Sequence, residues 1–190
     1  MTDKPALRRK LRRIRTLHEG RIPVSMRSLL FHRPPTPLLD LIPAEAVIGL
    51  YHPVGSEASP LAYARWFHEQ GHRVALPWFA ARGAPMQFRE WVSPYNDDSL
   101  VPAPYAGLQP ADAAAPLTID VAIVPLLGFT QDGQRIGQGA GHYDRYLAEH
   151  RHVVPIGLAW DCQLVDQLPL EPHDRAMTAV VTPTRMYGPF

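Results

Sequence analysis

The sequence predicts an α/β protein, a single domain over residues 1–190 in which helices and a mainly parallel, mixed central sheet form a three-layer sandwich. Segments with the pattern of strands alternate with segments with the pattern of helices, which is typical of this class. The run IDVAIVPLL at residues 119–127 is almost continuously apolar, as expected of a strand covered on both faces. A chain of 190 residues is long enough for one sizeable core and too short for two independent ones.

The first element, a basic segment over residues 1–33, is predicted to be helical. Thr2 or Asp3 can cap its first helix, and Pro5 suits the first turn. Spacings of 4, 3 and 3 residues place four apolar side chains on one face of that helix. They are Leu7, Leu11, Ile14 and Leu17.

The middle of the chain begins with a second helix, predicted over residues 23–32 because Pro34 and Pro35 follow it. A strand–helix–strand unit comes next, with its elements at residues 46–51, 60–70 and 73–77. Residues 86–91 alternate apolar and polar side chains as a half-exposed strand does. Residues 93–116, rich in Pro, Ala and Asp, are predicted to be an ordered loop.

The last third of the chain is predicted to continue the alternation. After the apolar run at residues 119–127 comes a glycine-rich segment, and after that segment a helix over residues 143–149. Strands are expected over residues 153–160 and 178–183 because both are apolar and rich in β-branched side chains.

Composition narrows the class of protein. Hydrophobic residues make up 46% and charged residues 19% of the chain, as in ordinary globular proteins. The longest apolar stretch, residues 119–129, contains Asp120 and is too short to cross a bilayer. The N-terminus lacks the apolar core of a signal peptide, and Cys162, the single cysteine, cannot form an internal disulfide, so a cytoplasmic location is expected. An organelle transit peptide would also be rich in Arg, but this N-terminus is poor in Ser.

Positive charge is concentrated at the N-terminus. Residues 1–33 carry a net charge of +8 and the rest of the chain −7. On one face of the first helix, Lys4, Arg8 and Arg12 recur every four residues. This face can complement the acidic body of the protein or bind a polyanionic ligand.

The glycine-rich segment GQRIGQGAGHYDRYLA, residues 133–148, follows a predicted buried strand, where ligands collect in α/β sheets. It matches neither G-x-G-x-x-G nor the P-loop. Three glycines at alternate positions can expose backbone N–H groups to one anion, and the helix that follows adds its positive end. Arg135 and Arg145 flank the glycines, and Asp144 suits the Mg²⁺ that accompanies a nucleoside triphosphate. A glycine-rich turn without a ligand fits the local pattern equally well.

The small number of lysines limits which residues could contact a triphosphate through an ammonium group. Lys4 and Lys10 are the only lysines of the chain. A flexible ammonium that reaches a triphosphate must therefore come from the N-terminal helix.

Four segments together resemble the 5-formyltetrahydrofolate cyclo-ligase family, also called methenyltetrahydrofolate synthetases. The string DGQRIGQGAGHYDR, from Asp132 to Arg145, resembles the family's signature. Lys4-x-x-Leu7-Arg8 is similar to its N-terminal ATP-contacting segment, and Gly55-Ser56-Glu57 to its substrate-binding acidic turn. Cys162-Gln163 through Leu168-Pro169, with Asp174, is similar to its C-terminal segment. The four segments occur in the family's order and cover most of the chain.

The resemblance implies a mixed α/β sandwich that cyclises 5-formyltetrahydrofolate to 5,10-methenyltetrahydrofolate with ATP and Mg²⁺. ATP phosphorylates the formyl oxygen, and N10 of the folate then attacks the formyl carbon. Because this attack is intramolecular, the enzyme mainly has to position its substrates. No protein nucleophile is required.

The resemblance also assigns residues. Glu57 and Tyr143 would orient the pterin end, Met86 and Trp91 would be apolar walls, and Asp144 and Asp174 would hold Mg²⁺. On the residues alone, a solvated loop acid is the favoured interpretation of Glu57, and a core side chain that of Trp91. The ATP site would comprise Lys4, Arg8, Arg135, Gly137, Gln138, Gly139, Gly141, His142, Tyr143, Asp144 and Arg145.

This chain departs from the family pattern at three positions. Many members carry a cation at the position of Gln138, some carry one at Ala140, and members usually have Tyr or Phe at the position of His142. A paralogue that binds folate or nucleotide without cyclising it therefore stays an alternative. The expected partner is a small molecule, folate with or without a polyglutamate tail, and the expected acting form is a monomer without nucleic-acid or membrane partners.

Two other patterns in the sequence are typical of different functions. Residues 68–72, HEQGH, match the H-E-x-x-H zinc motif, but Gly71 predicts that the helix ends before His72 reaches the same face. The basic N-terminal helix could bind nucleic acid, but it lacks interleaved aromatic residues, and its leucines are expected to be docked on the protein.

Overall fold

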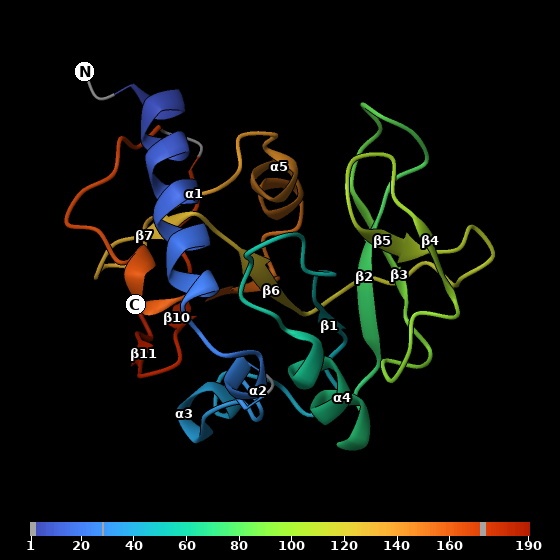
Figure 1. Cartoon of the computed structure of the whole chain (residues 1–190). Coiled ribbons are helices and arrows are strands. Elements are labelled where there is room, and N and C mark those ends of the chain that lie inside the picture. The colour runs from blue at the N-terminus through green and yellow to red at the C-terminus, as the bar shows by residue number, and fades with distance from the viewer. Residues whose placement is uncertain (1–2, 28, 172–173) are drawn as a thin grey trace.

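A seven-stranded mixed sheet runs through the middle of the protein in the computed structural model, which describes residues 3–27, 29–171 and 174–190 (Figure 1). The strand order is β11-β10-β9-β6-β1-β2-β3. The five inner strands run parallel, and the edge strands β3 and β11 pair antiparallel with β2 and β10. The strands span Ile48–Gly49 (β1), Val74–Trp78 (β2), Gln87–Glu90 (β3), Val121–Pro125 (β6), Val154–Leu158 (β9), Ala179–Val181 (β10) and Met186–Tyr187 (β11). The predicted mainly parallel, mixed sheet is confirmed.

Helices cover both faces of this sheet, which makes three layers (Figure 1). Side chains of successive strand residues point to opposite faces, so β6 supplies both cores. Ile123 belongs to the cluster that contains Phe67 of α4 (Leu61–Glu69), and Val124 to the cluster that contains Leu147 of α5 (His142–Glu149). All four side chains are fully buried. This two-sided burial explains the continuous apolar run in the sequence.

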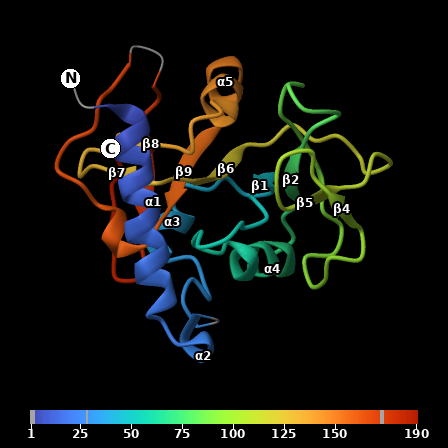
Figure 2. The same ribbon diagram turned by 45° about the horizontal axis from the view of Figure 1, so that its top comes forward.

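The helix α1 (Lys4–Gly20) lies in front of a small hairpin, β7 (Gly128–Phe129) and β8 (Arg135–Ile136), as Figure 2 shows. Leu11 packs against Leu127 and Ile136, and a Cβ at Gly128 would lie 2.9 Å from Leu11. Gly128 therefore lets α1 approach the hairpin closely.

The predicted apolar face of α1 is only partly correct. Leu11 is buried, but Leu17 is 53% exposed, whereas Arg15 is only 4% exposed. Asp3 occupies the cap position without a side-chain hydrogen bond, and Pro5 lies in the first turn, as expected. The other cap candidate, Thr2, lies outside the described residues.

Residues 23–39 differ from the prediction. A short helix, α2 (Val24–Arg27), replaces the long one, and Phe31 has a left-handed φ of 56° that no continuing helix permits. A further short helix, α3 (Thr36–Leu39), follows Pro35 at its cap position and has Pro37 in its first turn, where proline suits a helix start.

Short strands account for the remaining differences. The predicted loop at residues 93–116 contains a hairpin, β4 (Leu100–Pro102) and β5 (Leu108–Pro110). The hairpin β7–β8 and the edge strand β11 were also not predicted, since strands of two or three residues leave no periodic pattern. The predicted strand at residues 46–51 shortens to β1, although the N–H of Leu50 still donates to the carbonyl of Ala75 at 2.8 Å.

Among the described residues, a helix long and apolar enough to span a bilayer does not occur.

Candidate functional site

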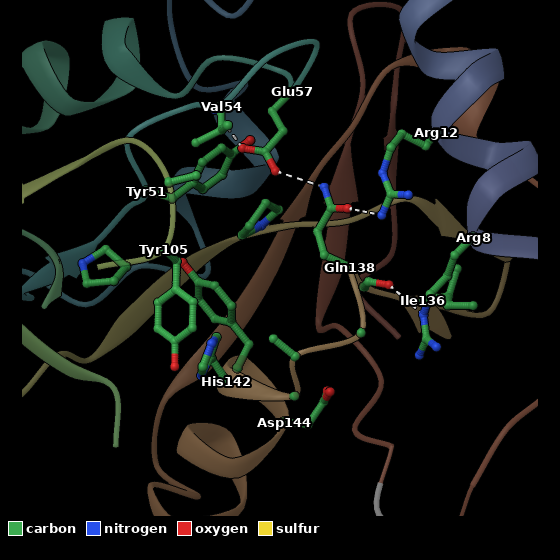
Figure 3. Close-up of a pocket in the computed structure, with 18 of the residues that line it drawn as sticks. Arg8, Arg12, Tyr51, Val54, Glu57, Tyr105, Ile136, Gln138, His142 and Asp144 are labelled. Carbon is green, nitrogen blue, oxygen red and sulfur yellow. Dashed lines mark hydrogen bonds between the residues drawn. The ribbon is translucent and has the colours of Figure 1, made fainter. Parts of the chain in front are cut away.

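One cleft of about 690 Å³ opens at the carboxyl ends of β1, β2 and β6. Its walls come from α1, the loop after β1, the β4–β5 hairpin, the glycine-rich loop between β8 and α5, and the C-terminal side chains Glu171 and Asp174. Figure 3 shows part of this lining, with side chains from segments distant in the sequence facing the same space. The predicted location at a carboxyl edge of the sheet is where this cleft lies.

Two glycines of the loop have backbone conformations that favour glycine. Gly139 has a φ of 109°, and Gly141, the residue before α5, has a φ of 67°. Gly137 lacks such a φ, but its carbonyl accepts a hydrogen bond from Nε of Arg8 at 3.1 Å. The loop therefore folds with its backbone against α1.

We expect Gly139→Ala to destabilise the protein by about 1–3 kcal/mol, because a Cβ is strained at this φ. The added Cβ would also lie 3.4 Å from the Arg8 guanidinium. The matched control is Gly20→Ala at the end of α1, where a Cβ meets no atom within 4 Å. Urea unfolding measures both; equal midpoints for the two variants would contradict the prediction.

The predicted cationic face of α1 points into the cleft. Lys4, Arg8 and Arg12 all line it. Nζ of Lys4 lies 3.2 Å from a carboxylate oxygen of Glu171 and 3.4 Å from one of Asp174. This placement leaves Arg9, Lys10 and Arg13 on the exposed side of the helix.

Arg15 also lines the cleft, although it was not among the predicted site residues. Its Nε donates to Oγ of Ser56 at 3.1 Å, and its Nη1 lies 3.9 Å from Oε1 of Glu57. Burial lowers the pKa of Arg15, and the nearby Glu57 carboxylate partly offsets this effect. The spacing of Arg12 and Arg15, three residues apart on one helix, indicates that both side chains lie on the same face.

Glu57 lies at the centre of the loop after β1. Its Oε2 accepts the N–H of Val54 at 2.9 Å, while Oε1 faces Arg15 and the side-chain amide of Gln138. This predicted substrate residue is therefore held by several partners inside the cleft, so the alternative of a freely solvated loop acid does not describe it.

Arg135 and Asp144 form an ion pair in the cleft. The Arg135 side chain is 4% exposed and that of Asp144 28%. Nε of Arg135 has no hydrogen-bond partner among the residues that the structure describes. A buried guanidinium with a spare donor at a cleft wall suits a phosphate oxygen.

Tyr143 places a second unsatisfied group at the same wall. Its hydroxyl is buried without a partner in the described part of the chain. Burial raises the pKa of Tyr143, and the Glu57 carboxylate raises it further. The hydroxyl therefore stays protonated at neutral pH and is available as a hydrogen-bond donor.

Two acidic residues of the cleft are predicted to hold Mg²⁺: Asp144, which is paired with Arg135, and Asp174, which is paired with Lys4. Within residues 3–27, 29–171 and 174–190, no group of three or more His, Cys, Asp or Glu side chains could hold a metal. Mg²⁺ is commonly bound by one or two carboxylates together with substrate phosphates and water. The donor set therefore fits Mg²⁺ that arrives with a polyphosphate.

An aromatic wall completes the cleft opposite the cations. The ring centroids of Phe79 and Tyr105 both lie 4.7 Å from that of His142. Met86 lines the cleft, as expected. Phe79 and Tyr105 were not predicted, because neither belongs to a recognisable motif.

Two predicted site residues do not line the cleft. Trp91 is 2% exposed and packs in the core, where the centroid of its ring lies 6.4 Å from that of the His52 ring. Arg145 folds back on the glycine loop and donates from Nη2 to the carbonyl of Ala140 at 2.9 Å. The other predicted site residues line the cleft.

We expect the imidazole of His142 to titrate below pH 6.5. Burial lowers its pKa, and the nearby Arg145 guanidinium lowers it further. The folded protein then binds its proton at lower pH than the unfolded chain, so acidification below about pH 6.5 costs stability. An NMR titration assigned with His142→Phe measures the midpoint; a value at or above 6.5 would contradict the prediction.

The zinc motif does not form a zinc site. The helix α4 ends at Glu69, and Gly71 has a φ of 89°, which turns the chain away. His72 instead places Nδ1 2.9 Å from the carbonyl of Ala46, and His68 packs its ring against Tyr95. The expected end of the helix before His72 is confirmed.

Comparisons with known proteins identify the family of this chain. A model of the 5-formyltetrahydrofolate cyclo-ligase family matches residues 1–183. The 5-formyltetrahydrofolate cyclo-ligase of Mycolicibacterium smegmatis is 39% identical over 142 residues, which cover 71% of this chain and 72% of that protein. The protein of the same name from Escherichia coli K12 is 48% identical over 71 residues, 36% of this chain and 39% of that protein.

Solved structures share the fold. The NMR structure of Aquifex aeolicus 5,10-methenyltetrahydrofolate synthetase has a TM-score of 0.73 at 21% identity and covers 96% of this chain and 93% of its own. The synthetase of Mycoplasma pneumoniae has a TM-score of 0.64 at 22% identity, with 94% and 98% covered. With a family model that matches all but the last seven residues, the chain belongs to the 5-formyltetrahydrofolate cyclo-ligase family.

Proposed function

We propose that this chain catalyses the ATP- and Mg²⁺-dependent cyclisation of 5-formyltetrahydrofolate to 5,10-methenyltetrahydrofolate, with release of ADP and phosphate. The observation that carries the proposal is one cleft in which the cations of α1 and of the glycine loop face an acidic and aromatic wall. Such a cleft can hold an anionic polyphosphate beside a flat, polar ring system.

The nucleotide belongs on the side of α1 and the glycine loop. Lys4, Arg8 and Arg135 would neutralise the triphosphate, and the loop from Gly137 to Gly141 would approach it closely because it lacks bulky side chains. Asp144 and Asp174 would hold the Mg²⁺, which neutralises phosphate charge when bound. Arg145 would act by holding the loop rather than by touching the nucleotide, since it bonds to Ala140.

The folate belongs against Glu57 and the aromatic wall. The Glu57 carboxylate would accept hydrogen bonds from the pterin, and the Tyr143 hydroxyl would donate one. Met86 and the ring of His142 would contact flat surfaces of the substrate, whereas Trp91 supports the wall from the core. Binding of folate that carries a polyglutamate tail, the monomeric state and the cytoplasmic location stay predictions.

The chemistry needs positioning more than reactive side chains. ATP supplies a phosphoryl group to the formyl oxygen, which turns that oxygen into a leaving group. N10 then attacks the formyl carbon within the same molecule, and the oxygen leaves as phosphate. Holding the two reacting centres in contact is worth about 7–11 kcal/mol in favourable cases, so the reaction does not require a protein nucleophile.

The test is formation of the methenyl chromophore from 5-formyltetrahydrofolate, with release of ADP measured in parallel. We expect both products in equal amounts, and neither when ATP or Mg²⁺ is left out. A non-catalytic paralogue, which the altered Gln138 and His142 keep as the second candidate, would bind folate and nucleotide in equilibrium dialysis without forming product. That outcome would overturn the proposed activity.

A further inference from the structure

Gln138 joins three segments across the cleft (Figure 3). Its Oε1 accepts a hydrogen bond from Nη2 of Arg12 in α1 at 2.9 Å. Its Nε2 donates to Oε1 of Glu57, in the loop after β1, at 3.2 Å. The side chain thus connects the cationic wall, where the nucleotide belongs, to the acidic group proposed for the folate.

Only a neutral side chain with a donor and an acceptor can make this bridge. Arg12 offers donors alone, and the Glu57 carboxylate offers acceptors alone. A lysine or arginine at position 138 would donate to the Glu57 carboxylate but repel the Arg12 guanidinium. A glutamate there would accept from Arg12 but repel Glu57. The amide of Gln138 satisfies both, and its orientation follows from them, because the flipped amide would place donor against donor.

The neighbouring contacts show that this bridge affects the orientation of the Glu57 carboxylate. Oε2 of Glu57 is already held by the N–H of Val54 at 2.9 Å, so Oε1 sets the remaining orientation of the carboxylate. Oε1 has a second neighbour, Arg15, but at the longer distance of 3.9 Å. The adjacent Gly137 holds Arg8 through its carbonyl. Two successive loop residues therefore each hold one arginine of α1.

We propose that Gln138 is a positioning residue that couples the two halves of the cleft. Through it, Arg12 helps to orient Glu57 toward the folate, although Arg12 lies on the nucleotide side. The proposal rests on the proposed function, because that function places folate at Glu57. It predicts that the loss of Arg12 weakens folate binding even when nucleotide is absent, and only while Gln138 is present.

A double-mutant cycle tests this coupling. The dissociation constant of 5-formyltetrahydrofolate is measured by calorimetry without nucleotide for the wild type, Arg12→Met, Gln138→Met and the double variant. We expect each single variant to weaken binding about 3- to 10-fold, the range for one hydrogen bond. The double variant should bind no more weakly than Gln138→Met, since the bridge is already lost.

Two controls separate coupling from general effects. Arg13→Met removes an exposed cation next to Arg12 that does not line the cleft, so folate affinity should stay at the wild-type value. Gln138→Met should raise KM for folate more than it lowers kcat, whereas a folding defect would lower the amount of active protein. Unchanged affinity in Arg12→Met, or additive losses in the double variant, would overturn the coupling while turnover by the wild type still supported the proposed function. Absence of folate binding by the wild type without nucleotide would overturn the coupling, and absence of turnover with ATP and Mg²⁺ as well would overturn both.

Discussion

Arg135→Met is expected to lower turnover by about 10²- to 10³-fold, the range for loss of one group that stabilises charge in the transition state. Arg135 is buried at the cleft wall and keeps Nε free of partners among the described residues. Its removal takes a fixed cation from the transferring phosphoryl group and leaves Asp144 without its ion-pair partner. The rate of methenyl formation at saturating ATP measures the effect.

The matched control for Arg135 is an arginine–carboxylate pair outside the cleft. Nε and Nη2 of Arg73 each donate to the carboxylate of Glu90 at 2.9 Å, on the protein surface. Arg73→Met should change stability by no more than about 1 kcal/mol and leave the rate unchanged. Equal rates in Arg135→Met and the wild type would show that the phosphates bind elsewhere.

Arg15→Met is expected to destabilise the protein by about 2–4 kcal/mol, because it removes one member of a buried ion pair. Ser56 loses the hydrogen bond from Nε, and the Glu57 carboxylate loses its nearby cation. In a chain of this length, such a loss lowers Tm by roughly 5–15 °C. Folate affinity should fall as well, since Glu57 then lacks part of its support.

The exposed neighbour Arg13 is the control for Arg15. Arg13→Met removes the same charge from the same helix, and exposed positions usually change stability by less than about 0.5 kcal/mol. Thermal unfolding compares the two variants with the wild type. If their melting temperatures agree, Arg15 does not stabilise the protein through its buried contacts.

The fold was predictable where burial repeats regularly along the chain. The run at residues 119–127 corresponds to β6, at the centre of the sheet, and the helix predicted over residues 60–70 corresponds to α4. The hairpins β4–β5 and β7–β8 were not predictable, because strands of two or three residues are set by their partners. Within the second predicted helix, Phe31 has a left-handed φ that a helix does not permit, and nothing in its residue type predicts that conformation.

The candidate site was predictable where a residue belongs to a motif. Lys4, Arg8 and Glu57 line the cleft, and so does most of the glycine loop. Phe79 and Tyr105 belong to no motif, and they meet His142 only because β2 and the β4–β5 hairpin bring them there. Trp91 was predicted to be an apolar wall of the site, but its side chain is buried in the core instead.

The sequence by itself determined the class of fold, the family and the segments that build the cleft, because these depend on periodic burial and on short local patterns. Only the tertiary structure decided which side chains meet. It turned Arg15 inward beside Glu57, placed Arg135 beside Asp144 and set Gln138 between Arg12 and Glu57. Each of these pairs joins separate segments of the chain, and their meeting follows from how α1 and the loops pack on the sheet.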